Sequence, residues 1–222
     1  MSQEAHQDPA QLHDRQDRHG PLVAFDFDGT VTTKDSFVAF LRWRAGPARF
    51  AAGLLRLAPA GISYGLNPDR GRFKAAAIKE FLAGTPREAL IEDARRFATH
   101  AAPELLRPDA VTVWRRHQKN GGRVVVVTAS PDLLVEPFAH GLGAELVIGT
   151  RLKFDSQDRV EGGLVGANCR GPEKVRRFQE IYGQDARPIA AYGDSDGDKE
   201  LVDYAETGFM RYFTGAPIKS RF

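Results

Sequence analysis

Two groups of acidic residues follow short apolar runs in this sequence, where strands are expected to end. Asp26 and Asp28 stand at the end of residues 22–27, and residues 194–198 (DSDGD) follow residues 188–192. Ligands bind at the carboxyl ends of strands in open α/β sheets, so Asp26 and Asp28 can both face such a crevice. Three acids within five residues predict a divalent-metal site. The alternatives are an Asp-Gly turn at the first group, and a solvated loop with an Asp helix cap at the second.

Two further residues favour the binding of a phosphate at the same end of the sheet. Thr128 closes the run 123–128 (RVVVVT), which is typical of a strand covered on both faces of a parallel sheet. Lys174 lies in the first turn of a helix that begins at Pro172, and the N-terminus of a helix favours anions. A threonine that merely ends a strand and a solvent-facing lysine are the alternatives.

The elements that would position these residues alternate between strands and helices. Apolar spacing and end signals predict helices over residues 36–43, 73–81, 85–99, 108–119, 130–140 and 172–182. Thr85 and Glu88 are expected to form a capping box. Further strands are expected over 145–150 and 208–212, with a hairpin over 151–166. This alternation predicts an α/β fold, with a Rossmann-like parallel sheet core and helices on both faces.

The charged residues are distributed unevenly along the chain, although its formal net charge is only +2. Residues 36–120 hold 15 Lys and Arg against 7 Asp and Glu, a net charge of +8. The elements predicted in this block are all helices. We therefore expect residues 21–35 and 121–222 to form the core, and residues 36–120 to form an all-helical cap inserted between the first and second core strands. Such a basic cap would face something anionic.

Composition excludes several classes of protein. A hydrophobic fraction of 42% and a charged fraction of 27% exclude general disorder and a collagen-like chain. The single cysteine, Cys169, cannot form an internal disulfide, and we expect it to be a small buried residue. We expect no membrane-spanning helix. Residues 1–20 have almost no apolar content, so we expect a disordered tail without a signal peptide, and hence a cytoplasmic protein.

Four motifs, taken in order, resemble those of the haloacid dehalogenase superfamily of phosphohydrolases. They are DFDGT, VVVVTAS, GPEK and GDSDGD, and the match covers residues 22–212. The helical block after the first motif is similar to the cap of the phosphoserine-phosphatase-like subfamily, IB. The stretches TASPDLLVEP and NCRGPEKVRR look like a bacterial branch of that subfamily, which includes uncharacterised phosphatases and phosphatidylglycerophosphate phosphatases.

This resemblance implies a Mg²⁺-dependent phosphatase that works through an aspartyl-phosphate intermediate. Asp26 would be the nucleophile, and Asp28 would protonate the leaving oxygen and then activate a water molecule. Splitting the hydrolysis into two transfers helps because a phosphomonoester dianion repels nucleophiles and its alkoxide leaves poorly. A non-catalytic module that keeps the fold is the alternative, and it would be marked by a lost motif residue, whereas none is lost here.

The resemblance also implies a set of binding residues. Mg²⁺ would be held by the side chains of Asp26 and Asp194 and by the backbone carbonyl of Asp28, with Asp198 supporting metal-bound water. Asp196 matches no required position and is expected to be exposed. The transferring phosphoryl oxygens would be held by Thr128, Lys174 and the backbone N–H groups around Gly29.

The resemblance restricts the substrate less closely, to a small phosphorylated metabolite or a lipid headgroup phosphate. Asp35 aligns with a glutamate that contacts the substrate in phosphoserine phosphatases, or else it caps the helix over 36–43. Those enzymes bind the substrate carboxylate with a cap arginine, and Lys79 and Glu80 lie near that position here. Glu80 would repel a carboxylate, which argues against phosphoserine.

An apolar stretch over residues 50–66 (FAAGLLRLAPAGISYGL) distinguishes this cap, and it has two interpretations. It is part of the core of the cap, or it is an interfacial segment that rests on anionic lipid at the inner face of a membrane. The second interpretation depends on the flanking arginines, which are Arg42, Arg44, Arg49, Arg56, Arg70 and Arg72. Pro59 and Gly61 are expected to interrupt any long helix. Nucleic acid is not expected as a partner, because no known binding motif accompanies the basic block.

Overall fold

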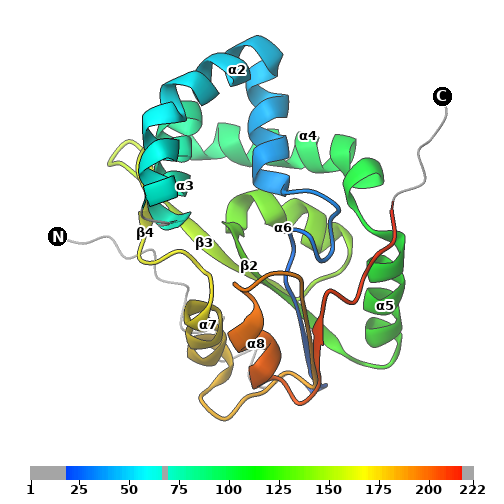
Figure 1. Ribbon diagram of the computed structural model, residues 1–222. Coiled ribbons are helices and arrows are strands. Elements are labelled where there is room, and N and C mark those ends of the chain that lie inside the picture. The colour runs from blue at the N-terminus through cyan, green and yellow to red at the C-terminus, as the bar shows by residue number, and fades with distance from the viewer. Residues whose placement is uncertain (1–18, 67–69, 217–222) are drawn as a thin grey trace.

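The computed structural model describes residues 19–66 and 70–216, with side chains except over 59–70 (Figure 1). The predicted disordered tail, residues 1–20, therefore lies almost entirely outside the described residues. Within these ranges the chain forms a six-stranded sheet with helices on both faces, and further helices stand above one end of the strands (Figure 1). This arrangement confirms the predicted α/β fold with a Rossmann-like core.

The first strand of the chain lies in the interior of the sheet. The strand order is β4–β3–β2–β1–β5–β6, and all neighbouring pairs are parallel except β3 and β4. Ala24 of β1 lies opposite Val125 of β2 on one side and Ala191 of β5 on the other. The carboxyl ends of β1, β2 and β5 therefore meet. The strands are β1 (Leu22–Phe25), β2 (Arg123–Pro131), β3 (Leu146–Phe154), β4 (Val160–Val165), β5 (Ala190–Gly193) and β6 (Gly208–Met210).

Helices cover both faces of this sheet, which explains the unbroken valine run of β2. Val124 and Val126 are buried with α5 and α6, whereas Val125 and Val127 are buried with α7 and α8. Successive side chains of a strand point to opposite faces, so a strand covered on both faces needs an apolar residue at every position. The four helices are α5 (Pro108–Lys119), α6 (Asp132–Gly141), α7 (Pro172–Tyr182) and α8 (Lys199–Tyr204).

Several strands differ in length from their predictions. The strand predicted over 123–128 continues to Pro131, and the one predicted over 188–192 runs from Ala190 to Gly193. The strand predicted to end at Thr150 continues to Phe154, pairing first in parallel with β2 and then antiparallel with β4. The first arm of the predicted hairpin is thus an extension of β3. The last strand ends at Met210 rather than at Tyr212, because Arg211 has a φ of 52° in the left-handed region, which a strand cannot continue through.

Three helices, α2 (Ser36–Leu66), α3 (Arg70–Leu82) and α4 (Arg87–Leu105), follow β1 in the chain. The predicted interruption of the first at Pro59 and Gly61 is wrong, because the backbone stays helical through Leu66. The break lies instead at Gly46, which has a φ of 73° and a ψ of 162°. Pro47 follows it, and a proline disfavours helical geometry in the residue before it.

The predicted capping signals of two helices are also wrong. Helix α4 begins at Arg87 with Pro86 as its N-cap residue and without a side-chain cap bond. The hydroxyl of Thr85 accepts a hydrogen bond from Arg44 Nη2 at 3.1 Å instead. Ser130 does not cap α6 either, because its hydroxyl donates to the carboxylate of Asp28. In both cases a tertiary partner takes the side chain that the local pattern assigned to the helix end.

Helix α5 packs against the sheet rather than against α2 or α3. Its Trp114 is fully buried, with its ring 5.0 Å from that of Phe25, and its Nε1 donates to the carbonyl of Leu142 at 3.0 Å. The division of the chain into core and cap stays a prediction. We propose that the cap ends before Pro108, because these contacts tie α5 to the core.

Replacing Trp114 by alanine should lower the free energy of unfolding by about 3–5 kcal/mol, because it removes a buried indole and its hydrogen bond. Urea denaturation followed by circular dichroism would measure this loss. Leu55→Ala is the control, because that side chain is 78% exposed and its loss should change stability by no more than about 0.5 kcal/mol. Equal losses in the two variants would contradict the role given to Trp114.

Candidate active site

Asp26 lies buried at the end of β1, among three other elements. Its backbone N–H donates to the carbonyl of Tyr192 in β5 at 2.8 Å, which holds the residue in line with the sheet. Its carboxylate accepts one hydrogen bond from Lys174 Nζ at 2.6 Å and another from Thr30 Oγ1 at 3.2 Å. The acid of the first motif and the lysine of the third, 148 residues apart in the chain, therefore meet as the motifs predicted.

Lys174 is the cation at the centre of this group, and only 1% of it is exposed. Its three N–H groups donate to Asp26 at 2.6 Å, to Asp198 at 2.5 Å and to the carbonyl of Val127 at 2.6 Å. Burial acts to lower the pKa of Lys174, but the two carboxylates outweigh it and hold the pKa above its usual value. The lysine is thus a permanent positive charge, and the alternative of a solvent-facing lysine is excluded.

Three carboxylates converge beside this lysine. One oxygen from each of Asp26, Asp194 and Asp198 lies within 4.8 Å of the other two. Burial and the charge of Asp198 raise the pKa of Asp26 to about 7, against the opposing effect of Lys174. Burial and Asp198 also raise the pKa of Asp194. Carboxylates gathered in this way are short of positive charge, and oxygen donors so arranged suit a divalent cation such as Mg²⁺.

Asp198 has hydrogen-bond partners on both of its carboxylate oxygens. Oδ1 accepts from Lys174, whereas Oδ2 accepts from Ser195 N at 3.0 Å and from Ser195 Oγ at 2.8 Å. Burial raises the pKa of Asp198, but Lys174 and Ser195 outweigh burial and leave the pKa below its usual value. Asp198 therefore fixes the shape of the loop that carries Asp194, while Asp196 in the same loop is exposed as expected.

Gly29 allows Asp194 to reach the cluster. Its φ is 81°, in the left-handed region, and a Cβ atom there would lie 2.1 Å from Asp194 Oδ2. A larger residue here would therefore strain the backbone and displace the Asp194 carboxylate. A simple Asp-Gly turn would also explain a glycine at this position. In the structure, the glycine makes room for the carboxylate of Asp194, which approaches from another loop.

Asp28 stands apart from the three-carboxylate cluster, and its side chain is held by two serines. Ser36 N donates to Oδ1 at 2.7 Å, and Ser130 Oγ donates to Oδ2. Burial raises the pKa of Asp28 and Asp35 raises it further, whereas the bonds from Ser130 and Ser36 oppose both. The predicted proton-transfer residue is thus fixed by one donor from α2 and one from β2.

The remaining predicted residues take up different positions. Asp35 is exposed and accepts a hydrogen bond from Val38 N at 2.8 Å, so it is the N-cap of α2. Thr128 is 1% exposed, and its hydroxyl accepts from Ser130 N at 3.0 Å. Cys169 is fully buried, and burial raises the pKa of its thiol to about 11, which makes it an inert core residue as expected.

Lys74 of α3 enters the site although nothing in its sequence surroundings indicated this. Its Nζ donates to the carbonyl of Ala129 and, at 3.2 Å, to Asn168 Oδ1. Burial lowers its pKa, against the opposing charges of Asp28 and Asp35. The sequence placed Lys79 and Glu80 near the substrate position. In the structure Glu80 binds Arg49 at 2.6 Å and Arg56 at 3.0 Å, between α2 and α3, and Lys79 is exposed.

Ser130 is the second residue that the sequence analysis did not assign to the site. A signal for it existed, because it lies two residues after Thr128 on the same strand and period-two alternation places both side chains on one face. Lys74 had no such signal, since a lysine in a basic helix is ordinary and its partners Ala129 and Asn168 lie 55 and 94 residues away.

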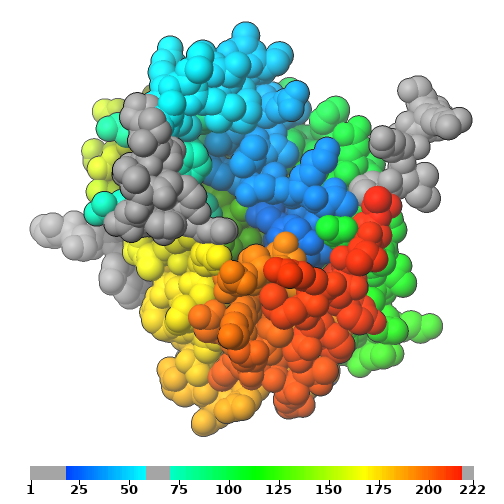
Figure 2. Space-filling view, in the orientation of Figure 1, coloured from blue at the N-terminus to red at the C-terminus, as the bar shows by residue number. Residues whose placement is uncertain are grey.

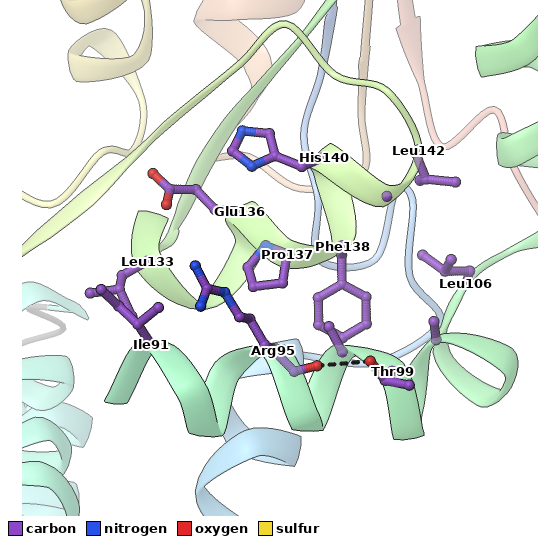
Figure 3. Close-up of a pocket in the computed structure, with 13 residues that line it drawn as sticks. Ile91, Arg95, Thr99, Leu106, Leu133, Glu136, Pro137, Phe138, His140 and Leu142 are labelled. Carbon is purple, nitrogen blue, oxygen red and sulfur yellow. Dashed lines mark hydrogen bonds between the residues drawn. The ribbon is translucent and has the colours of Figure 1, made fainter. Parts of the chain in front are cut away.

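A cavity of about 600 Å³ lies elsewhere, between α4 and α6 (Figure 3). Arg95 and Thr99 on α4 and Glu136 and His140 on α6 line it, and the ring of Phe138 points from α6 toward α4. None of the predicted site residues lines this cavity. It is therefore a surface groove separate from the carboxylate cluster.

Comparisons with known proteins agree with this geometry. A family model described as haloacid dehalogenase-like hydrolase matches residues 23–203. Protein CicA of Caulobacter vibrioides (strain NA1000 / CB15N) is 56% identical over 200 residues, which are 90% of each protein. Phosphoserine phosphatase of Halobacterium salinarum (strain R1) is 29% identical over 193 residues, 84% of this chain and 83% of that protein.

The fold is also similar to that of a solved structure of a substrate-bound phosphoserine phosphatase complex. The TM-score is 0.60 at 16% sequence identity, over 87% of each chain. At this identity the likeness concerns the fold. Among the described residues, no helix is long and apolar enough to cross a membrane.

Replacing Gly29 by alanine should weaken Mg²⁺ binding roughly tenfold or more, because the new methyl group displaces the Asp194 carboxylate. Titration calorimetry with Mg²⁺ would measure the affinity. Gly46→Ala is a matched control, since Gly46 has a similar φ of 73° but nothing within 4 Å of its added Cβ. If Gly46→Ala weakened Mg²⁺ binding as much as Gly29→Ala, backbone strain rather than the displaced carboxylate would explain the loss.

Proposed function

Since the chain belongs to the haloacid dehalogenase-like hydrolase family and is a phosphatase, we propose that it hydrolyses phosphomonoesters through an aspartyl-phosphate on Asp26. The observation that carries this proposal is the convergence of Asp26, Lys174 and Asp194 at the ends of neighbouring strands. A buried carboxylate beside a permanent cation and a second acid is suited to accept a phosphoryl group.

In the first step, an oxygen of Asp26 attacks phosphorus and the bond from phosphorus to the leaving oxygen breaks. Asp28 supplies a proton to that oxygen, so the group leaves as an alcohol rather than as an alkoxide. In the second step Asp28 takes a proton from water, the water oxygen attacks phosphorus, and Asp26 is released as a carboxylate. Ser36 and Ser130 hold the Asp28 carboxylate in one orientation, which both steps require.

The side chains of Asp26 and Asp194 and the backbone carbonyl of Asp28 would hold Mg²⁺. Bound Mg²⁺ supplies charge neutralisation that lets a carboxylate approach a phosphate dianion. Asp198 keeps its role as an anchor, because its bonds to Lys174 and Ser195 fix the loop. The phosphoryl oxygens would be held by Thr128, Lys174 and the backbone N–H groups around Gly29.

For the substrate, we propose a phosphomonoester whose leaving group carries a negative charge. Lys74 supports this, because its ammonium group donates to the carbonyl of Ala129, the residue before Ser130, and Ser130 in turn bonds Asp28. Lys74 donates to the neutral oxygens of Ala129 and Asn168. A hydrogen bond from Lys74 to an anionic group would be stronger than either of these bonds. A soluble metabolite and a lipid headgroup phosphate both meet this requirement. Asp35 would lie near the same group, and its contact with substrate stays a prediction.

Asp26→Asn should lower kcat for p-nitrophenyl phosphate roughly a thousandfold or more, because an amide cannot form the phosphoryl intermediate. Steady-state hydrolysis at saturating Mg²⁺ would measure it, and the same assay in EDTA should show no turnover until Mg²⁺ is restored. Asp196→Asn is the isosteric control, since Asp196 is exposed and should be dispensable. Substantial turnover by Asp26→Asn, or full activity in chelator, would refute the mechanism.

Lys74→Met should lower kcat/KM for phosphoglycolate, whose leaving group is anionic, by roughly tenfold or more, because a hydrogen bond to a charged group is lost. For p-nitrophenyl phosphate, whose leaving group carries no full charge before cleavage, the loss should be less than about threefold by the same reasoning. The two ratios are compared with those of Lys79→Met, an exposed lysine of the same helix. Equal losses on both substrates would show that Lys74 does not select an anionic leaving group.

A further inference from the structure

The second half of α2 carries an exposed apolar surface along the outside of the cap. We call it the outer face of α2, and it consists of Pro47, Ala48, Ala51, Leu54, Leu55 and Ala58, all of them exposed. Leu55 is 78% exposed and Leu54 is 48% exposed. This part of the helix forms the top of the molecule in the view of Figure 2. Single exposed leucines are ordinary, but a helix face made only of apolar residues is not.

The opposite face of the same helix is apolar too, and it already has a partner. Phe50 packs on Phe81 of α3 with ring centroids 5.5 Å apart, and Leu57 is 8% exposed. Gly53 brings the helix so close that a Cβ atom would lie 2.3 Å from the ring of Phe81. A helix on the surface of a soluble protein usually turns polar residues outwards. This one is apolar on both sides, although only its inner face is covered by α3.

The charges beside the outer face are basic. Arg49 and Arg56 both bind the same oxygen of Glu80, at 2.6 Å and 3.0 Å, so two guanidinium groups share one carboxylate. Helix α2 contains four arginines and no acidic residue. The side chain of Arg56 remains 63% exposed despite its ion pair. Arg49, Arg56 and Glu80 together therefore carry a net positive charge of one beside the apolar surface.

We propose that the outer face of α2 docks on the surface of an anionic lipid bilayer. Leu54 and Leu55 would enter the boundary between headgroups and acyl chains, while Arg49 and Arg56 would contact lipid phosphates. A second copy of the chain is a poorer occupant, because symmetric contact would bring the same arginines together. This inference goes beyond the proposed hydrolysis and does not depend on it, since docking needs no turnover.

The test is co-sedimentation of the purified full chain with vesicles. Vesicles of phosphatidylcholine with phosphatidylglycerol should bind the protein at low salt, whereas vesicles of phosphatidylcholine alone should bind it at least tenfold more weakly. The double variant Leu54→Glu with Leu55→Glu should lose at least tenfold of the binding to anionic vesicles. Arg56→Gln should lose part of it and become less sensitive to added salt. Hydrolysis of p-nitrophenyl phosphate should be unchanged in these variants, which also shows that they fold.

Val165→Glu is the matched control, because Val165 is 46% exposed on β4, outside the outer face of α2, and its variant should bind vesicles normally. Absence of binding to anionic vesicles at low salt would overturn the proposal, as would equal binding by the Leu54 and Leu55 double variant. Analytical sedimentation without lipid tests whether a second copy of the chain binds this face instead. A dimer that the double variant abolishes, in a chain that does not bind vesicles, would assign this face to self-association instead.

Discussion

The ammonium group of Lys174 is the charge around which the rest of the site is built. Removing an ammonium ion from water is very unfavourable unless anions surround it, and here Asp26 and Asp198 do so from two different strand ends. The two buried carboxylates in turn need the positive charge of the lysine, because burial also disfavours their charged form. The loop after β1, the loop after β5 and the first turn of α7 are therefore held in one relative position by electrostatics as well as by packing. One ammonium group faces three carboxylates, so the cluster still lacks positive charge, which a divalent cation would supply.

The sheet supplies the precision that this charge arrangement needs. Because β1 lies between β2 and β5, Asp26 and the loops after both neighbours come to one point without long connections. The two apolar cores, one on each face of the sheet, fix where the end of each strand lies relative to its neighbours. Gly29 and Gly193 then permit close approach, since a Cβ atom at Gly193 would lie 2.4 Å from that of Asp198. Packing and the two glycines therefore hold the carboxylates at short distances from one another, against their mutual repulsion.

Most of the sheet and the carboxylate cluster could be predicted from the sequence, whereas some helix ends and one site residue could not. Unbroken valines and acids at strand ends are local signals, and they placed Asp26, Thr128 and Asp194 correctly at one end of the sheet. Local signals failed where a distant partner decided the outcome. Thr85 and Ser130 looked like helix caps, but Arg44 and Asp28 take their hydroxyls. The contact of Lys74 with the core depends on how the cap sits over the sheet, which no spacing along the chain encodes.

The hydrogen bond from Ser36 N to Asp28 links the position of α2 to the orientation of the Asp28 carboxylate. Ser36 is the first residue of α2, so its N–H moves with the helix that leads into the cap. A different position of this first turn relative to β2 would remove one of the two donors that orient Asp28. The orientation of the Asp28 carboxylate is therefore tied to the packing of Phe37 and Phe40, which hold the start of α2 in the main apolar core.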